Sequence, residues 1–358
     1  MTGGLPPEAY AAALAALPGV GPAELGRLLA GGRGPGEAWR RALADRRPRP
    51  PDDVVANGWA ALRAAGVGVS VVGLPGYPPA LVSDLEAPAV LFAKGDVAAI
   101  EGRRVAIVGT RNCSRYGRDV AFELGRDLAA QGVRVVSGLA LGIDGAAHAG
   151  ALAAGVAPPV AVVGSGLDVV YPRRHDHLWR QIGEAGVLLS EAPLGAPPEA
   201  WRFPVRNRIL AALAEVVVVV ESPHAGGSRY TVDAAMSRDR PIMAVPGPVR
   251  SRTSDLPNAL LSEGCHPARD ALDVLVALDL APAAAGRPGA RTPADTRPPP
   301  EPVEAAVLEA VGWQPASFEQ VVVASGRPPA EVGLALAHLE RDGWVAASGG
   351  WWERNGTG

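Results

Sequence analysis

Six short apolar runs recur between residues 105 and 245, with amphipathic stretches between them. Within each run the apolar residues are continuous and do not alternate with polar ones, which is typical of strands covered on both faces in a parallel sheet. The amphipathic stretches 119–131 and 145–154 are predicted to be helices. Two further apolar pieces, near 69–72 and 90–93, would extend the sheet or cap its edge. The six predicted strands are 105–108, 133–136, 160–163, 187–189, 216–220 and 242–245.

Strands that alternate with helices predict an α/β domain with a doubly wound, mostly parallel sheet, which we place at residues 65–281. The first 64 residues differ, because their leucines recur at helical spacing on both sides of the Pro- and Gly-rich segment 18–22. That segment resembles the turn of a helix-hairpin-helix, whose glycine amides can face a DNA backbone, although packing two helices is the more common use of such a turn. We predict a small helical domain at 1–64, with an exposed Arg-rich linker near its end. Its arginines are Arg40, Arg41, Arg46, Arg47 and Arg49.

The C-terminal part of the chain begins with a Pro-rich stretch. Residues 282–302 hold seven prolines and almost no large apolar side chain, which predicts a linker. Beyond it, 303–311, 317–325 and 329–341 are predicted to be helices, and 344–346 with 351–353 a hairpin. Three helices followed by a two-stranded hairpin are typical of a winged-helix domain, here 303–358. It carries three arginines against seven acidic residues, a net charge of −4, so we expect it to bind protein rather than DNA.

Composition narrows the class of protein. No apolar run reaches the length of a membrane span and no secretory signal is visible, so we expect a cytoplasmic protein without a membrane partner. The two cysteines, Cys113 and Cys265, form neither a disulfide framework nor a zinc spacing. Because the net charge is −3, a nucleic-acid site must be a local patch. Lys94 is the only lysine, so the abundance of arginine reflects coding bias, and only the positions of the arginines are informative.

The segment 201–208 reads Trp-Arg-Phe-Pro-Val-Arg-Asn-Arg, directly upstream of an apolar helix predicted to start near Ile209. Guanidinium groups pair with phosphate oxygens and aromatic faces accept unstacked bases, which favours a single-stranded nucleic acid as the ligand. The alternative is a loop whose rings pack on the core while its arginines stay solvated. Asn207 is expected to bond backbone groups and fix this segment.

Polar and basic residues also follow the other predicted strands, at the edge where helix N-termini present free amides to anions. The backbone amides and hydroxyls would form the floor of a site at this edge, and the guanidinium groups would surround it. Such a site suits phosphates. Neither a dinucleotide-binding glycine motif, nor a P-loop, nor a nucleophile elbow is present, so we predict no cofactor and no enzymatic activity. Asp144 and His148 could share a helix face as metal ligands, but no third ligand follows at fixed spacing, and a helix-capping Asp with a core His is preferred. The candidates at strand ends include Arg111, Ser114, Ser137, Gly138, Arg173 and Ser228.

The ordered blocks of this region resemble the DprA, or Smf, family of DNA-processing proteins across residues 70–280. The resemblance implies an extended Rossmann domain that binds single-stranded DNA, forms homodimers and loads the RecA recombinase during natural transformation and DNA repair, with single-strand-binding protein as a further candidate partner. It also implies a pocket lined by Arg111, Ser137, Gly138, the basic positions after Tyr171-Pro172, Phe203, Arg206 and Arg208, with Arg202 nearby. The blocks are 105–111, 136–148, 164–172, 189–191, 203–209 and 244–247.

Two other functions compete with this interpretation. A phosphoribohydrolase-like nucleotide hydrolase has a comparable sheet, and Gly226-Gly227-Ser228 with Thr231 faintly resembles its loop, but Ala234 stands where that loop has its glutamate. A transcription regulator would act through the winged-helix domain.

Overall fold

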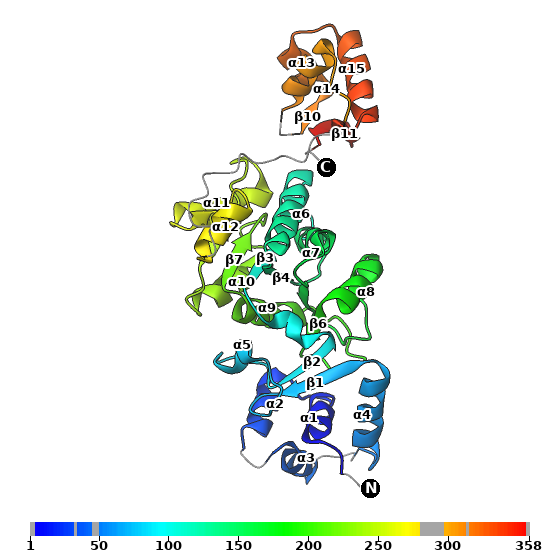
Figure 1. Ribbon diagram of the computed structural model, residues 1–358, viewed down its shortest axis with the longest axis vertical. Helices are drawn as coiled ribbons and strands as arrows, with labels where there is room; N and C mark the ends of the chain where they lie inside the picture. The colour runs from blue at the N-terminus through cyan, green and yellow to red at the C-terminus, as the bar shows by residue number, and fades with distance from the viewer. Residues whose placement is uncertain (1–3, 32–33, 45–49, 280–296, 313–314, 356–358) are drawn as a thin grey trace. The chain divides into compact units, whose positions relative to one another are not determined.

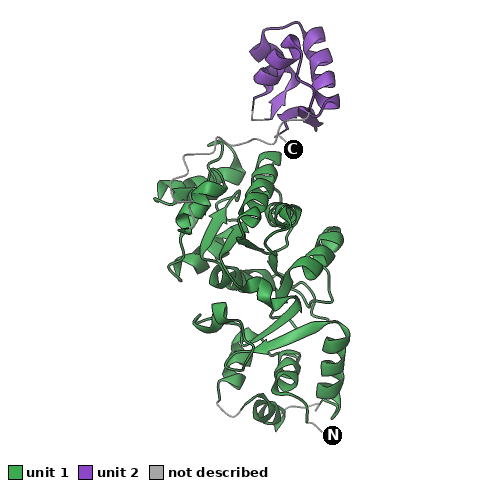
Figure 2. Cartoon of the chain, viewed as in Figure 1, with its two compact units in different colours: residues 1–281 green, residues 282–358 purple. Residues whose placement is uncertain are grey.

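The computed structural model describes residues 4–31, 34–44, 50–279, 297–312 and 315–355. The chain divides into two compact units, Met1–Ala281 and Pro282–Gly358, which are coloured separately in Figure 2. Within the described residues, no helix has the length and hydropathy needed to cross a lipid bilayer.

A nine-stranded sheet forms the centre of the first unit, in the order β1-β2-β6-β5-β4-β3-β7-β8-β9. The seven neighbouring strands β6, β5, β4, β3, β7, β8 and β9 pair in parallel. Strand β2 pairs antiparallel with both β1 and β6. This confirms the mostly parallel doubly wound sheet, with the two early apolar pieces as its antiparallel extension. The strands are β1 (Val67–Val71), β2 (Val90–Gly95), β3 (Arg104–Val108), β4 (Arg134–Ser137), β5 (Val160–Val162), β6 (Val187–Ser190), β7 (Val216–Val219), β8 (Ile242–Ala244) and β9 (His266–Pro267).

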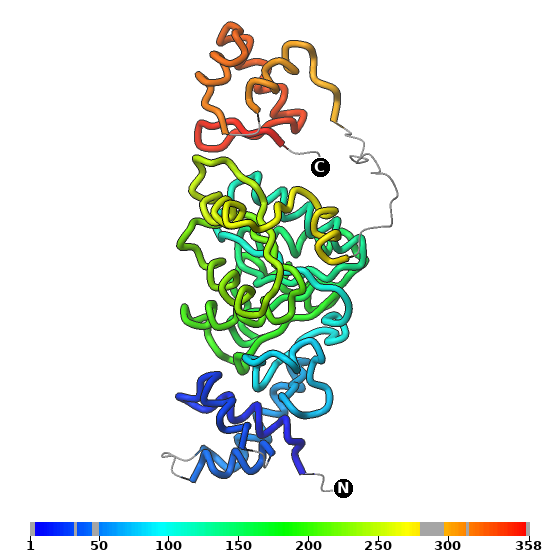
Figure 3. Tube along the Cα trace, turned by 90° about the vertical axis from the view of Figure 1, so that its left-hand side faces the viewer, coloured from blue at the N-terminus to red at the C-terminus, as the bar shows by residue number. Residues whose placement is uncertain are grey.

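Helices cover both faces of this sheet, which explains why the central strands are apolar at every position (Figure 1). Val105 and Ile107 of β3 face α6, α7 and α12, whereas Ala106 and Val108 face α9, α10 and α11. Figure 3 shows the path of the chain as a Cα trace, turned by 90° about the vertical axis from the view of Figure 1. The helices are α5 (Pro79–Val82), α6 (Arg115–Ala130), α7 (Ile143–Ala154), α8 (Asp176–Ala185), α9 (Arg202–Leu213), α10 (Ser228–Met236), α11 (Asp255–Ser262) and α12 (Ala271–Ala277), with short 3-10 turns at Val97–Ile100, Arg173–His175 and Arg252–Ser254.

The N-terminal helices pack against β1 and β2 and share one hydrophobic core with them, including Leu14 and Phe92. Residues 1–64 are therefore part of the first compact unit and do not form a unit of their own. The two helices predicted around the 18–22 turn are present. Arg40 and Arg41, which we predicted in a linker, lie in a helix, whereas Arg46, Arg47 and Arg49 lie outside the described residues. The helices are α1 (Pro7–Ala15), α2 (Pro22–Leu29), α3 (Pro35–Ala44) and α4 (Val54–Ala64).

The second unit has the predicted winged-helix architecture, with three helices around a small core and a three-stranded sheet in the order β10-β12-β11. Most of the predicted linker lies outside the described residues, but its last part packs on this unit, where the Arg297 guanidinium stacks 3.9 Å from the centroid of the Trp344 ring. The elements are α13 (Pro302–Val311), β10 (Ala316–Ser317), α14 (Phe318–Ser325), α15 (Pro329–Arg341), β11 (Val345–Ser348) and β12 (Trp351–Arg354).

Candidate single-stranded nucleic-acid site

Three side chains, two from loops and one from the first turn of α9, meet at the carboxyl ends of the central strands. The Arg111 guanidinium, in the loop after β3, lies 4.7 Å from the centroid of the Phe203 ring. Tyr171 lies in the loop after β5. The centroid of its ring is 5.6 Å from the centroid of the Phe203 ring, and the two ring planes are tilted by 34°. Arg111 and Tyr171 are exposed and Phe203 is half-buried. We call these three residues the Arg111–Phe203–Tyr171 cluster.

Phe203 reaches the cluster because α9 begins earlier than the sequence pattern predicts, at Arg202 and not near Ile209. Pro204 therefore lies in the first turn, where the missing N–H costs nothing because the amides of that turn have no partner within the helix. The loop after β5 lies against the ring, since a Cβ at Gly164 would come within 3.2 Å of Phe203 Cδ1. The helix start and this glycine together fix the aromatic face at the sheet edge.

Arg206, predicted to bind phosphate, is buried in the structure, with an exposed fraction of 7%. Its guanidinium donates to the backbone oxygen of Val162 and leaves no room for a side chain at Gly138. Burial lowers the pKa of Arg206 to about 10, and the nearby Asp144 carboxylate opposes that shift, so the guanidinium stays charged at neutral pH. Burial also raises the pKa of Asp144, while Arg206 acts to lower it. Arg206 therefore supports the floor of the site from inside the protein and is not positioned for a direct contact with DNA.

Arg208 is also engaged within the protein. It pairs with the Glu191 carboxylate at 2.5 Å and donates to the backbone oxygen of Glu86. Burial raises the pKa of Glu191, and the Arg208 charge opposes this shift. The expectation that Arg208 is open to phosphate is thus not met in this conformation, because the half-buried Glu191 carboxylate already pairs with it.

Ser114 caps α6, accepting from the amide of Gly117 at 3.0 Å. Its amide and hydroxyl both donate to the carboxylate of Glu221, at 2.8 and 2.7 Å, and the Thr253 hydroxyl donates to the same carboxylate at 3.1 Å. Glu221 therefore occupies the N-terminal end of α6, at the point where strand order reverses between β3 and β7. This end of a helix is where a dinucleotide phosphate binds in related sheets, and here a carboxylate of the chain itself holds the position.

The remaining predicted contacts fall into two groups. Ser137 is buried and donates to the Ile107 oxygen at 2.6 Å, and Asn207 donates to the Gly227 oxygen at 3.2 Å, the backbone role expected of it. Ser228 is buried as well. By contrast, Arg173 and its neighbour Arg174 are exposed just beyond Tyr171, and Arg202 lies half-buried at the start of α9. The structure brings Arg111, Arg173, Arg202 and Phe203 to the surface of one edge.

Arg202 does not stand free at that edge. Its Nε donates to Glu199 at 3.0 Å, and its guanidinium stacks 4.5 Å from the centroid of the Trp201 ring. His175, close after Tyr171-Pro172 in the sequence, is half-buried and makes a 3.1 Å hydrogen bond with the Leu139 oxygen through Nδ1. The His148 ring is buried with Nε2 3.2 Å from the Val160 oxygen, the hydrogen bond expected of a core histidine.

Sequence reasoning missed three residues. Tyr171 was noted only as part of a motif, although it precedes the basic pair 173–174 in the loop after a buried strand. Glu221 is the first polar residue after the run 216–220, and a carboxylate in that place is a signal for an internal helix cap. Asp144 was expected to cap a helix, and it is also the acidic group whose charge acts on the buried Arg206 guanidinium.

Two family models match the chain. One, described as DNA recombination-mediator protein A, matches residues 69–279, and the other, described as DprA winged helix domain, matches residues 291–350. The chain belongs to the DNA recombination-mediator protein A family.

Relatives of the DprA family are similar over most of their length. Protein Smf of Escherichia coli is 36% identical, covering 78% of this chain and 75% of its own. The putative DNA processing protein DprA of Mycobacterium tuberculosis is 39% identical, covering 76% of this chain and 70% of its own. Each of them shares the sheet region that carries the cluster.

Solved DprA structures share the fold. DNA processing protein A of Streptococcus pneumoniae matches with a TM-score of 0.60 and 30% identity, covering 76% of this chain and 93% of its own. DNA processing protein A of Helicobacter pylori, described for its single-stranded DNA binding mode, matches with a TM-score of 0.54 and 27% identity, covering 60% of this chain and 97% of its own.

Proposed function

We propose that this protein binds single-stranded DNA at the Arg111–Phe203–Tyr171 cluster and acts as a recombination mediator that breaks no bond itself. The observation that carries the proposal is the exposed Arg111 guanidinium stacked over Phe203 at the carboxyl edge of the sheet. A guanidinium binds phosphate oxygens, and an adjacent ring face accepts one unstacked base, so the two together hold one nucleotide. The described binding mode of the Helicobacter relative supports the same ligand.

A single strand suits the cluster better than a duplex. In a duplex each base face is already stacked on its neighbours, so Phe203 and Tyr171 would gain no base. The exposed Arg173 and Arg174 extend the positive charge beyond Tyr171, where the next phosphates of a strand would lie. Arg206 and Arg208 contribute by holding the floor of the site in place.

The experiment compares the affinity of the full chain for single-stranded and duplex DNA of equal length over a salt series. We expect tighter binding of the single strand and an affinity that falls as salt rises, because counterions are released from each neutralised phosphate. Equal affinity for both forms, or no dependence on salt, would contradict the proposal.

Hydrolysis of a nucleotide is the competing activity. Ala234 lies where the phosphoribohydrolase loop has its glutamate, and Glu221 holds the helix N-terminus that a phosphate would use. Both features argue against nucleotide hydrolysis. An assay for nucleoside monophosphate hydrolysis tests this point, and turnover would overturn the non-enzymatic assignment.

The family membership supports three partner proposals. We propose that the protein passes its strand to the RecA recombinase in the cytoplasm, during transformation and repair, that it works as a homodimer through the Rossmann-like sheet, and that it meets single-strand-binding protein on the same DNA. RecA filament formation on a strand covered by single-strand-binding protein is the test of the first proposal. The molar mass in solution tests the second.

For the winged-helix unit we propose a protein partner. The exposed face of α15 carries Glu331, Leu334, Ala337 and Glu340, a mixture of acidic and apolar side chains that suits neither phosphate nor a base edge. Removing residues 283–358 should therefore leave most of the single-strand affinity, whereas a regulator acting through this unit would lose it.

A further inference from the structure

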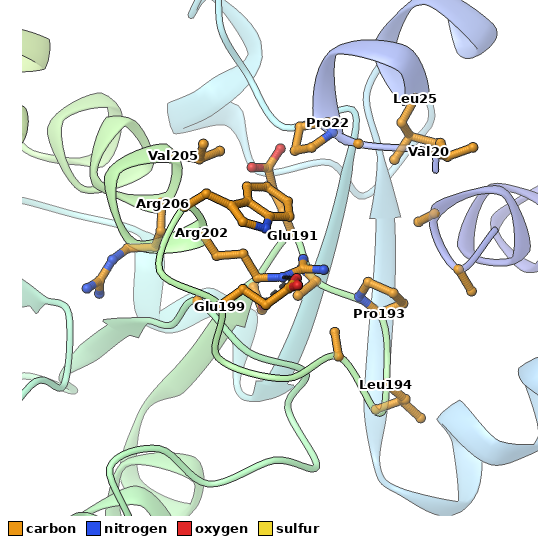
Figure 4. Close-up of a pocket in the computed structure, with 18 of the residues that line it drawn as sticks. Val20, Pro22, Leu25, Glu191, Pro193, Leu194, Glu199, Arg202, Val205 and Arg206 are labelled. Atoms are coloured by element: carbon orange, nitrogen blue, oxygen red, sulfur yellow. Dashed lines mark hydrogen bonds and ion pairs between the residues drawn. The ribbon is translucent and has the colours of Figure 1, made fainter. Parts of the chain in front are cut away.

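A second pocket lies beside the cluster, between the 18–22 turn and the carboxyl edge of the sheet, with a volume of about 570 Å³ (Figure 4). Val20, Pro22 and Leu25 form one apolar wall, and α9 with the loop after β6 forms the other. Both walls belong to the first compact unit. The proposed function makes no use of this pocket.

The opposite wall has an exposed ring face and acidic groups. Trp201 lines the pocket with an exposed fraction of 46%. Glu191 and Glu199 line it as well, and the Arg202 guanidinium is already paired with Glu199 and stacked on Trp201. Arg206 contributes only its stem, because its guanidinium points away from the pocket in Figure 4. An aromatic face beside carboxylate oxygens, which accept hydrogen bonds, suits a nucleobase with amino donors.

The pocket and the cluster are neighbours. Gly164 lines the pocket, and the same glycine packs against the ring of Phe203. Trp201, which lines the pocket, and Phe203 lie two residues apart in the sequence, at the start of α9. A strand that stacks a base on Phe203 would thus reach the pocket with a neighbouring nucleotide.

We propose that this pocket holds a second unstacked base of the same DNA strand, stacked on Trp201, with its phosphate at the 18–22 turn. The inference rests on the proposed function and adds a subsite to it. Carboxylate oxygens only accept hydrogen bonds, so a base edge with amino donors fits them, as in cytosine and adenine. Thymine presents a carbonyl oxygen in the corresponding place and is the poorer ligand.

The turn provides the second contact. Helix α2 starts there at Pro22 with no side-chain cap, so the amides of its first turn are available to an anion. Gly21, the N-cap residue, lines the pocket and has open space where a side chain would lie, with an ordinary φ of −89°. This residue can therefore be changed without strain.

The first test replaces Trp201 by alanine. We expect the affinity for oligo(dC) to fall by about five- to a hundredfold, the usual effect of losing one stacked base, and the affinity for oligo(dT) to fall less. The matched control is Trp351→Ala, which removes a tryptophan of the same 46% exposure from the winged-helix unit and should change neither affinity. Phe203→Ala is measured in parallel.

The outcomes separate the two proposals. If Trp201→Ala binds like the parent protein while Phe203→Ala is impaired, the pocket is not a base site and the proposed function stands. If neither variant is impaired, the proposed function fails and the subsite fails with it. An equal loss on oligo(dC) and oligo(dT) would overturn the amino-donor preference.

A second pair of variants tests the turn. Asp and Asn are both good N-cap residues, so Gly21→Asp and Gly21→Asn should preserve α2 equally. Only the aspartate places a negative charge beside the passing phosphate. We expect Gly21→Asp to bind single-stranded DNA more weakly than Gly21→Asn, with the difference shrinking at high salt. Equal affinities would exclude a phosphate at this turn.

Discussion

The Arg206 guanidinium lies inside the protein, where the Asp144 carboxylate acts to raise its pKa. Burial weakens the preference of both groups for their charged forms, and their mutual attraction opposes this. The pair is thus a support for the site, and removing one partner would leave the other buried and uncompensated.

For this pair we predict a loss of stability rather than of phosphate contact. Arg206→Ala should lower the free energy of unfolding by about 3 to 5 kcal/mol, the usual effect of an unpaired buried charge. Urea unfolding measures it, and the apolar double variant Arg206→Met with Asp144→Leu should recover much of the loss. A normal unfolding midpoint in Arg206→Ala, combined with weaker DNA binding, would return Arg206 to the list of DNA contacts.

Glu221 is predicted to stabilise the start of α6. Glu221→Ala leaves the Ser114 amide and hydroxyl and the Thr253 hydroxyl without their acceptor, and should lower the free energy of unfolding by about 3 kcal/mol. Glu221→Gln keeps one oxygen acceptor and should lose less. Equal stabilities of the Ala and Gln variants would show that these hydrogen bonds do not hold the helix end.

The free energy of unfolding should depend on pH because of the buried His148. Burial lowers the pKa of His148 to about 4, from 6.5 in the unfolded chain, with His175 and Arg206 adding smaller repulsions. As pH falls, the unfolded state therefore binds the proton first, so stability is fully present above about pH 6.5 and is lost toward pH 4. Between pH 6.5 and 5 the loss should be about 2 kcal/mol.

His148→Leu is the variant that checks this. It removes the titrating group, so its unfolding free energy should change less over the same pH interval, measured by urea unfolding at each pH. The parent protein and the variant having the same slope would show that His148 does not titrate in this way.

The sequence was sufficient for the sheet, because strands covered on both faces must be apolar at every position. It was insufficient for α9, where Pro204 and the polar neighbours resemble a loop although a helix tolerates proline in its first turn. It also could not separate Arg111 from Arg206. The family resemblance predicts both arginines to line the pocket. Only the folded chain places Arg206 in the interior under the influence of Asp144 and leaves Arg111 on the surface.

Replacing Arg111 and replacing Phe203 should have different effects on DNA binding. Arg111→Ala removes a phosphate contact, so it should weaken binding to all sequences and flatten the dependence of log affinity on log salt by about 0.7. Phe203→Ala removes a stacking face, so it should cost about 1 to 3 kcal/mol of binding without changing that slope. Phe203→Trp, which keeps a ring, is the control for the second change.

The most direct measurement is the salt dependence of single-strand affinity for the parent protein, Arg111→Ala and Phe203→Ala, followed by fluorescence anisotropy. We expect weaker binding in both variants, a shallower slope in Arg111→Ala and an unchanged slope in Phe203→Ala. Affinity and slope equal to those of the parent in both variants would contradict the proposal, because no strand would then contact the Arg111–Phe203–Tyr171 cluster.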